Sequence, residues 1–192
     1  MNDMAFARLP DALPAIQRET ERLGFTMASE PKTGALLAAL AATKPGGRLL
    51  ELGTGTGLGT AWLLLGMDAS ARLDTVDTDP RVVEVARECL GGDPRVAFHL
   101  EDGALYLGRA SRGAFDLVYA DAWPGKFTHL DEALSLLRPG GVYVIDDLLP
   151  QANWPDGHDR RVRALIDDIE GRPGLATARL SWASGLMLAV RI

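Results

Sequence analysis

Short apolar runs alternate with helical segments along most of this chain, and this alternation limits the folds that it can adopt. The runs are rich in Val, Leu and Tyr and are bounded by Gly, Pro or Asp, as strands are. Strands that alternate with helices form a mostly parallel sheet with helices on both faces. The runs predict strands at Arg48–Leu52, Arg72–Val76, Val96–Leu100, Phe115–Ala120, Gly141–Ile145, Ala176–Trp182 and Leu186–Val190.

The segments between these strands have helical periodicity, which makes the predicted fold α/β. Only Ala183–Gly185 separates the last two strands, so they should form a hairpin and give the sheet one antiparallel strand. We expect residues 1–47 to supply N-terminal helices of the same domain, and residues 48–192 to form its core. Helices are predicted at Asp11–Leu23, Gly34–Ala42, Thr60–Met67, Pro80–Leu90, Ala104–Arg109, Phe127–Leu137 and Asp159–Glu170.

Composition narrows the class of protein further. A chain of 192 residues with 47% hydrophobic and 24% charged residues is typical of one ordered, water-soluble domain. The net charge of -6 argues against nucleic-acid and anionic-membrane partners. The N-terminus has no secretory h-region, so we expect a cytoplasmic protein. Cys89 is the single cysteine, which excludes disulfides and cysteine-rich zinc sites.

A glycine-rich loop follows the first predicted strand and precedes a helix. It reads Gly53-Thr54-Gly55-Thr56-Gly57-Leu58-Gly59, so its backbone can approach a ligand directly. A dinucleotide fingerprint would need glycine at 58 or 60, and a P-loop would need a Gly-Lys-Ser/Thr ending. Both phosphate-binding interpretations are therefore weakened.

Asp77 ends the second strand, about twenty residues beyond the loop, where a carboxylate can accept hydrogen bonds from both hydroxyls of a ribose. A helix cap is the alternative role for such a residue. Asp79 fills that role better because it directly precedes Pro80. The ligand should thus carry a ribose and need no phosphate.

These motifs together carry a resemblance to a known superfamily. ELGTGTG, VDTDP, the turn Glu101-Asp102-Gly103 and the strand FDLVYAD resemble a class I S-adenosylmethionine-dependent methyltransferase, which implies a single-domain Rossmann-like fold with a seven-stranded sheet. The resemblance implies that the glycine loop holds methionine, Asp77 the ribose and Asp102 the adenine, although Asp102 could instead be a turn or cap carboxylate. The cofactor-binding residues it implies are Glu51, Gly53, Thr54, Gly55, Gly57, Asp77, Thr78, Asp102, Gly103 and Asp121.

Three further segments, SEPKTGALLAAL, DAW and IDD, more narrowly resemble the catechol-type and cation-dependent O-methyltransferases. Asp121 ends the fourth strand, and Asp146 and Asp147 end the fifth, so all three should open onto one crevice. Three carboxylates at one place repel each other unless a cation joins them, and Mg²⁺ or another divalent cation suits oxygen ligands. They are our candidate metal ligands, with ordinary strand-end carboxylates as the alternative.

The chain departs from the cation-dependent pattern at two places. Members of that family have lysine three residues after the first aspartate, and Asp-Asn after the fifth strand. Here Pro124 stands in the lysine position, Lys126 follows two residues later, and Asp147 replaces the asparagine. These departures leave open both the metal and the identity of the base. Lys126 is either a base that reaches the site or a solvated lysine at a helix start.

The remaining candidates surround the expected acceptor pocket. His158 is a third candidate catalytic residue, after Asp121 and Lys126, because the loop that carries it directly follows the acidic pair. Trp123 and Trp154 could line the pocket or pack on neighbouring helices. By the resemblance, residues 26–33 complete the methionine end of the cofactor site or form its lid.

We therefore expect an S-adenosylmethionine-dependent O-methyltransferase that acts on a small hydroxylated molecule, with divalent-cation assistance as one possibility. The alternatives are a metal-independent O- or N-methyltransferase and a non-catalytic S-adenosylmethionine-binding module. A nicotinamide dehydrogenase is disfavoured by the missing fingerprint glycine. The expected partner is the small-molecule acceptor, and a homodimer remains a candidate assembly.

Overall fold

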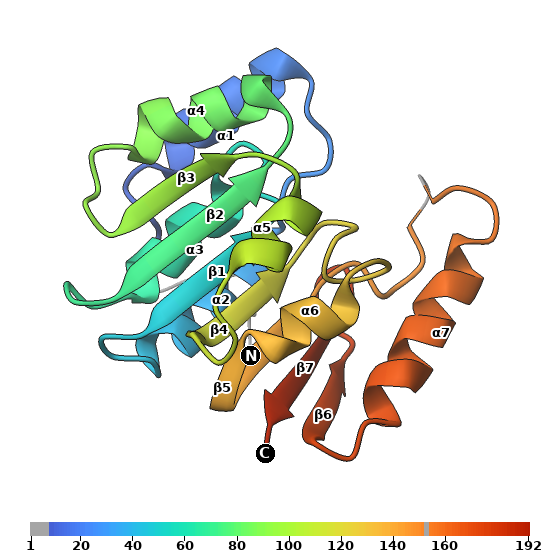
Figure 1. Cartoon of the computed structure of the whole chain (residues 1–192). Coiled ribbons are helices and arrows are strands. Elements are labelled where there is room, and N and C mark those ends of the chain that lie inside the picture. Colours follow the sequence, from blue (N-terminus) through green and yellow to red (C-terminus); the bar gives the residue numbers. More distant parts are fainter. Residues whose placement is uncertain (1–7, 152–153) are drawn as a thin grey trace.

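Seven strands form one sheet in the computed structural model, which describes residues 8–151 and 154–192 (Figure 1). Their bounds are β1 Arg48–Leu52, β2 Arg72–Asp77, β3 Val96–Leu100, β4 Phe115–Ala120, β5 Leu137–Ile145, β6 Leu175–Leu180 and β7 Leu186–Arg191. The spatial order is β3-β2-β1-β4-β5-β7-β6. The chain thus winds outward from β1 in one direction and from β4 in the other, which places a crevice where the order reverses.

The sheet is parallel except at β7. This strand pairs antiparallel with both β5 and β6, and Leu180 faces Leu186 at the hairpin end. Consequently β6 returns to the direction of the other strands. The predicted α/β fold, the hairpin and the single antiparallel strand are confirmed.

Helices cover both faces of the sheet, and each face has its own apolar core. Side chains of α1 to α4 join β-strand residues such as Leu49 and Leu117 in one core, whereas α5 to α7 pack with Leu50, Val118 and Ile145 in the other. The helices are α1 Leu13–Leu23, α2 Pro31–Ala42, α3 Leu58–Gly66, α4 Pro80–Leu90, α5 Gly103–Arg109, α6 Leu130–Ser135 and α7 His158–Glu170. The two helices before β1, α1 and α2, therefore belong to the same packed body as the sheet.

One predicted helix was too long at both ends. The sequence predicted a helix over Phe127–Leu137, but α6 is confined to Leu130–Ser135. His129 has a left-handed backbone (φ 55°), which separates α6 from the preceding turn. Leu137 already pairs with Phe115 as the first residue of β5, so strand pairing ends the helix on the other side.

The carboxyl ends of the parallel strands lie at one edge of the sheet, and the loops that follow them lie along that edge (Figure 1). The glycine loop lies after β1, Asp77 ends β2, and the acidic residues follow β4 and β5. No helix among the described residues has the length and apolar character needed to cross a membrane.

Candidate functional site

The glycine loop between β1 and α3 depends on conformations that other residues rarely adopt. Gly53, Gly55 and Gly57 have φ angles of 102°, 51° and 94°. A Cβ on Gly53 would lie 2.6 Å from the backbone oxygen of Asp121, so β1 and β4 leave no room for a side chain there. The loop is thereby held against the sheet edge, with its backbone facing the crevice.

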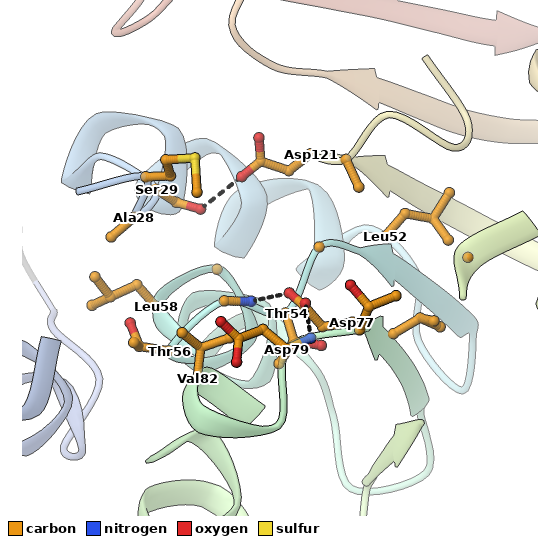
Figure 2. Close-up of a pocket in the computed structure, with 18 of the residues that line it drawn as sticks. Ala28, Ser29, Leu52, Thr54, Thr56, Leu58, Asp77, Asp79, Val82 and Asp121 are labelled. Carbon is orange, nitrogen blue, oxygen red and sulfur yellow. Dashed lines mark hydrogen bonds between the residues drawn. The ribbon is translucent and has the colours of Figure 1, made fainter. Parts of the chain in front are cut away.

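Asp77 is anchored to this loop by its carboxylate. Oδ2 accepts the backbone N–H of Gly55 at 2.9 Å, and Oδ1 accepts that of Asp79 at 3.0 Å (Figure 2). Each carboxylate oxygen keeps further acceptor capacity, which is what a pair of ribose hydroxyls needs. Asp79 caps α4 by accepting the N–H of Arg81 at 2.9 Å, as the sequence indicated, and the contact of Asp77 with a ribose stays a prediction.

A cavity of about 420 Å³ opens beside Asp77. Ala28 and Ser29, from the segment before α2, form its opposite wall (Figure 2). Met27 of the same segment also lines the cavity. That segment lies within the stretch expected to complete the methionine end, whereas Thr33 is fully buried in α2. The predicted cofactor residues that line the cavity are Gly53, Thr54, Gly55, Asp77, Thr78, Asp102, Gly103 and Asp121.

Two predicted cofactor residues, Gly57 and Glu51, are not part of the cavity wall. Glu51 is completely buried and accepts hydrogen bonds from the hydroxyls of Thr60 and Thr75. Burial raises the pKa of this carboxyl to about 7. Its Oε1 has no hydrogen-bond partner among the described residues, and a Cβ on Gly59 would collide with it. Glu51 thus lies directly behind the wall, and its contact with methionine stays a prediction.

Asp102 combines the two roles that the sequence left open. Its carboxylate accepts the backbone N–H of Ala104 at 2.7 Å and caps α5. The same residue lines the cavity, together with Gly103. Its contact with an adenine therefore remains a prediction, beside a capping role that the structure shows.

The three acidic residues after β4 and β5 come together as expected, but Asp146 has its own partners. Its Oδ2 accepts the hydroxyl of Tyr119 at 2.7 Å, and its Oδ1 accepts the N–H of Asp147 at 2.8 Å and the hydroxyl of Ser184. Asp146 is 3% exposed. Its carboxylate is thus turned into the protein and satisfied by three donors.

Tyr119 and Ser184 were missed by sequence reasoning. Tyr119 lies two residues before Asp121, so strand alternation places both side chains on the same face, which is a signal that could have been used. Ser184 lies in the hairpin between β6 and β7, and only the sheet order brings it next to β5. No local pattern predicts that contact.

Lys126 reaches the acidic residues from the turn after β4. Its side chain is 6% exposed, and Nζ donates to the backbone oxygen of Asp146 at 3.1 Å. Nζ also lies 3.8 Å from Oδ1 of Asp121 and 3.9 Å from Oδ2 of Asp147. A solvated lysine at a helix start is therefore not what the structure shows.

The turn itself explains how this lysine reaches inward. The backbone oxygen of Trp123 accepts the N–H groups of Lys126, Phe127 and Thr128. Gly125 adopts a φ of 91°, and its oxygen accepts the hydroxyl of Tyr143 at 2.6 Å. Because the turn is tight, Lys126 reaches the acidic residues although it lies two residues beyond Pro124, which stands in the family's lysine position.

Burial and charge shape the ionisation of this cluster. Burial raises the pKa of Asp121 well above its usual range; the charges of Asp146 and Asp147 add to the effect, and Lys126 opposes it. Burial also raises the pKa of Asp147. Ser29 donates to Oδ2 of Asp121 at 3.3 Å. The hydroxyl of Tyr119 lies 3.1 Å from the same oxygen and 2.7 Å from Oδ2 of Asp146, so its single proton is shared between the two carboxyl groups.

The predicted metal ligands do not fit a divalent cation in this arrangement. The described residues contain no group of three or more His, Cys, Asp or Glu side chains placed to hold a metal ion. Both oxygens of Asp146 already accept hydrogen bonds, two at Oδ1 and one at Oδ2, and the Lys126 ammonium lies within 4 Å of an oxygen of both Asp121 and Asp147. The expected metal centre is thus replaced, in this structure, by an ion-pair cluster.

A second cavity, of about 300 Å³, lies on the acceptor side and shares Met27, Ala28, Ser29, Asp121 and Ala122 with the first. Its wall is aromatic, and the ring centroids of neighbouring members lie 4.7 to 5.4 Å apart. Both tryptophans that the sequence proposed contribute to it. The aromatic lining consists of Trp123, Phe127, Trp154 and His158.

His158 begins α7 and is 8% exposed. Its Nδ1 is buried without a hydrogen-bond partner among the described residues. Burial, together with the nearby cations Lys126 and Arg161, lowers the pKa of the imidazole. The lowered pKa favours the neutral ring, whose unprotonated nitrogen can accept a proton.

Comparison with known proteins agrees with this geometry. A family described as Methyltransferase domain matches residues 50–148, which include the glycine loop, Asp77 and all three acidic residues. A Mycobacterium avium (strain 104) protein named "Putative O-methyltransferase" is 32% identical over 191 residues, covering 94% of this chain and 86% of its own. A Mycolicibacterium vanbaalenii protein of the same name is 34% identical and covers 95% of this chain and 74% of its own.

Solved structures show the same fold. Cofactor-bound Rv0187 from MTB superposes with a TM-score of 0.85 at 27% identity, over 98% of this chain and 93% of its own. The O-methyltransferase TomG from Streptomyces achromogenes, in complex with SAM and involved in tomaymycin synthesis, gives 0.82 at 25% identity, over 96% and 91% of the two chains.

Proposed function

Because the chain belongs to the methyltransferase-domain family and is a class I S-adenosylmethionine-dependent O-methyltransferase, we propose that its acceptor is a small molecule with a hydroxyl group. The observation that carries this proposal is the junction of the two cavities at Asp121 and Ser29. A cofactor on one side and a small acceptor on the other would meet at that junction. A cavity of about 300 Å³ suits a small molecule rather than a macromolecule.

The cofactor cavity fits S-adenosylmethionine by its donor and acceptor set. Asp77 offers carboxylate oxygens to a ribose, and the loop from Gly53 to Gly57 offers a close backbone. When bound, the cofactor supplies a methyl group on a positively charged sulfur. Asp121 lies in the wall of both cavities, and a positive charge at their junction would favour ionisation of its carboxyl group, whose pKa burial otherwise raises.

The chain's own residues must then place the acceptor oxygen and take up its proton. In the balanced reaction the methyl–sulfur bond breaks, its electron pair stays on sulfur, a methyl–oxygen bond forms, and the hydroxyl proton goes to a base. We assign the proton to the neutral imidazole of His158, because it is buried in the acceptor cavity and carries an unpaired nitrogen. The aromatic wall orients the acceptor and excludes water.

Turnover with hydroxylated acceptors tests the proposal. Purified protein is incubated with S-adenosylmethionine and matched pairs of small molecules that differ only in a hydroxyl, an amine or neither. We expect S-adenosylhomocysteine and an O-methylated product with the hydroxyl member of a pair alone. Methylation of the amine member alone would instead support an N-methyltransferase. The expected cytoplasmic location and the homodimer are separate proposals, for which fractionation and light scattering are the measurements.

A further inference from the structure

Three carboxyl groups line the acceptor cavity, and their like charges repel one another unless something offsets them. Asp121, Asp146 and Asp147 place three carboxyl groups at the ends of two neighbouring strands. Two of them line the cavity with little contact to bulk water: the side chain of Asp121 is 13% exposed, and Asp146 is 3% exposed. Buried like charges need a compensating cation or must lose their charge.

The side chain of Lys126 supplies a cation at this place. Its ammonium lies within 4 Å of oxygens of Asp121 and Asp147, and it donates to the backbone oxygen of Asp146. Since the side chains of Lys126 and Asp121 are only 6% and 13% exposed, solvent screens the pair between them weakly. An ammonium has three N–H donors, and the structure records one of them in a hydrogen bond. The other two remain able to reach an oxygen in the cavity.

A divalent cation would have to compete for the same oxygens. Mg²⁺ binds carboxylate oxygens at about 2.1 Å and prefers octahedral ligand sets. The Asp146 carboxylate is already bound by Tyr119, Ser184 and the N–H of Asp147. A metal at Asp146 would have to displace these donors, and at Asp121 and Asp147 it would meet the ammonium, which lies within 4 Å of an oxygen of each.

We propose that the Lys126 ammonium is the resident cation of the acceptor site, so that this enzyme neither binds nor requires a divalent metal. The ammonium holds Asp121 and Asp147 together and presents an N–H to the acceptor oxygen. That contact with the acceptor rests on the proposed function, whereas the exclusion of metal does not. Placement of the lysine follows from the Trp123–Thr128 turn, in which Pro124 and Gly125 set the backbone.

The first experiment measures metal binding without any reaction. Thermal unfolding and Mn²⁺ electron paramagnetic resonance are recorded for the wild type and for Lys126→Met, each with chelator and with millimolar Mn²⁺ or Mg²⁺. We expect no Mn²⁺ binding and no thermal shift for the wild type. Lys126→Met frees the carboxylates, so Mn²⁺ should bind to it and raise its melting temperature. Lys44→Met is the matched control, because the ammonium of Lys44 also donates to a backbone oxygen, that of Gly140, but in an exposed hydrogen bond.

A second variant guards against loss of folding, since Lys126→Met leaves buried carboxylates without their cation. The double variant Lys126→Met, Asp147→Asn removes one charge of each sign and should remain folded. It should bind Mn²⁺ more weakly than Lys126→Met, because one carboxylate ligand has become an amide. Wild-type protein that binds Mn²⁺ and loses this binding in Asp147→Ala would overturn the proposal.

Activity gives an independent readout once an acceptor is known. Wild-type turnover should be equal in chelator and in millimolar Mg²⁺. Lys126→Met should lower kcat by roughly 10²–10³-fold, as expected when a donor to a developing oxygen charge is removed. Its affinity for S-adenosylmethionine should stay unchanged. Wild-type turnover that disappears with chelator and returns with Mg²⁺ would refute the proposal, whereas failure to find any turnover would bear on the proposed function and leave the metal-binding result standing.

Discussion

The two halves of this site are built in different ways. The cofactor half consists of backbone groups in a strand-to-helix loop, together with Asp77, which that loop binds through Gly55. The acceptor half consists of side chains from the segments before α2, after β4, after β5 and between β6 and β7. Local sequence can encode the first kind of site, because turn residues and spacing determine it. Only tertiary packing can assemble the second.

Substitutions in the glycine loop should have the largest effects, and they test the difference between the two halves of the site. Gly57→Val forces a β-branched residue to a φ of 94°, and its Cβ would lie 3.0 Å from that of Ala86. We expect a loss of roughly 3 kcal/mol or more in the free energy of unfolding. Gly55→Val is the matched variant, since its Cβ would meet only Phe25 at 3.3 Å, although its φ of 51° is still strained.

Gly55→Val should keep the fold and lose S-adenosylmethionine binding, because residue 55 lines the cavity and residue 57 does not. Chemical denaturation and calorimetry separate the two outcomes. If both variants unfold alike and both bind the cofactor, the loop is only a turn and the comparison between the halves fails.

Glu51 tests whether a carboxyl group buried behind the wall of the cofactor cavity destabilises the folded protein when it is ionised. The folded-state pKa of about 7 lies above the usual 4.5, so the folded state holds this proton more tightly than the unfolded state. Its contribution to stability is complete below about pH 4.5 and is lost as the pH rises to about 7. The shift corresponds to about 3 kcal/mol as an upper bound.

Glu51→Gln should therefore be more stable than the wild type at about pH 8 and no more stable at about pH 4. Urea denaturation at both values measures the difference. Glu84→Gln, in the exposed face of α4, controls for the loss of a surface charge. A parallel pH dependence in Glu51→Gln and the wild type would mean that Glu51 does not titrate in this range.

Asp77 should have the next largest effect on cofactor binding, and its substitution also removes the acceptor for the backbone N–H groups of Gly55 and Asp79. Asp77→Ala removes the acceptor predicted for two ribose hydroxyls, which should weaken S-adenosylmethionine binding by about 1–3 kcal/mol. Asp79→Ala removes the cap of α4 and should instead cost about 1 kcal/mol of stability. Calorimetry should thus show the larger loss of cofactor affinity in Asp77→Ala, while denaturation measures the stability of both variants. Unchanged cofactor affinity in Asp77→Ala would remove the ribose assignment.

The sequence predicted correctly the features that strand ends and turn residues determine, and it missed those that depend on tertiary packing. The hairpin, the capping role of Asp79 and the gathering of Asp121 with Asp146 follow from strand ends and turn residues. The inward position of Lys126 depends on the turn at Trp123, which periodicity interpreted as the start of a helix. Ser184 and Glu51 depend on which buried groups meet across the sheet, and no local pattern reports that.

Substitution of Asp147 should have the smallest effect on the free energy of unfolding, and it tests most directly whether folding of the acceptor half depends on this side chain. Its backbone is left-handed (φ 60°), a conformation that asparagine tolerates well, and its side chain is 48% exposed. Because burial raises its pKa, ionisation is less favourable in the folded state, and wild-type stability falls as the pH rises through that pKa. Asp147→Asn should leave the free energy of unfolding unchanged or raise it by about 0.5 kcal/mol at neutral pH. The gain should vanish in acid.

Asp146→Asn is the matched variant for this last prediction. It makes the same change from carboxylate to amide at a residue whose carboxylate accepts three hydrogen bonds. An amide nitrogen there faces a donor, which should cost about 1–3 kcal/mol. Denaturation of both variants across pH compares them directly. If Asp147→Asn is as destabilising as Asp146→Asn, the pair between Asp147 and Lys126 is needed for folding, and side-chain packing in the acceptor half is as demanding as the backbone geometry of the cofactor half.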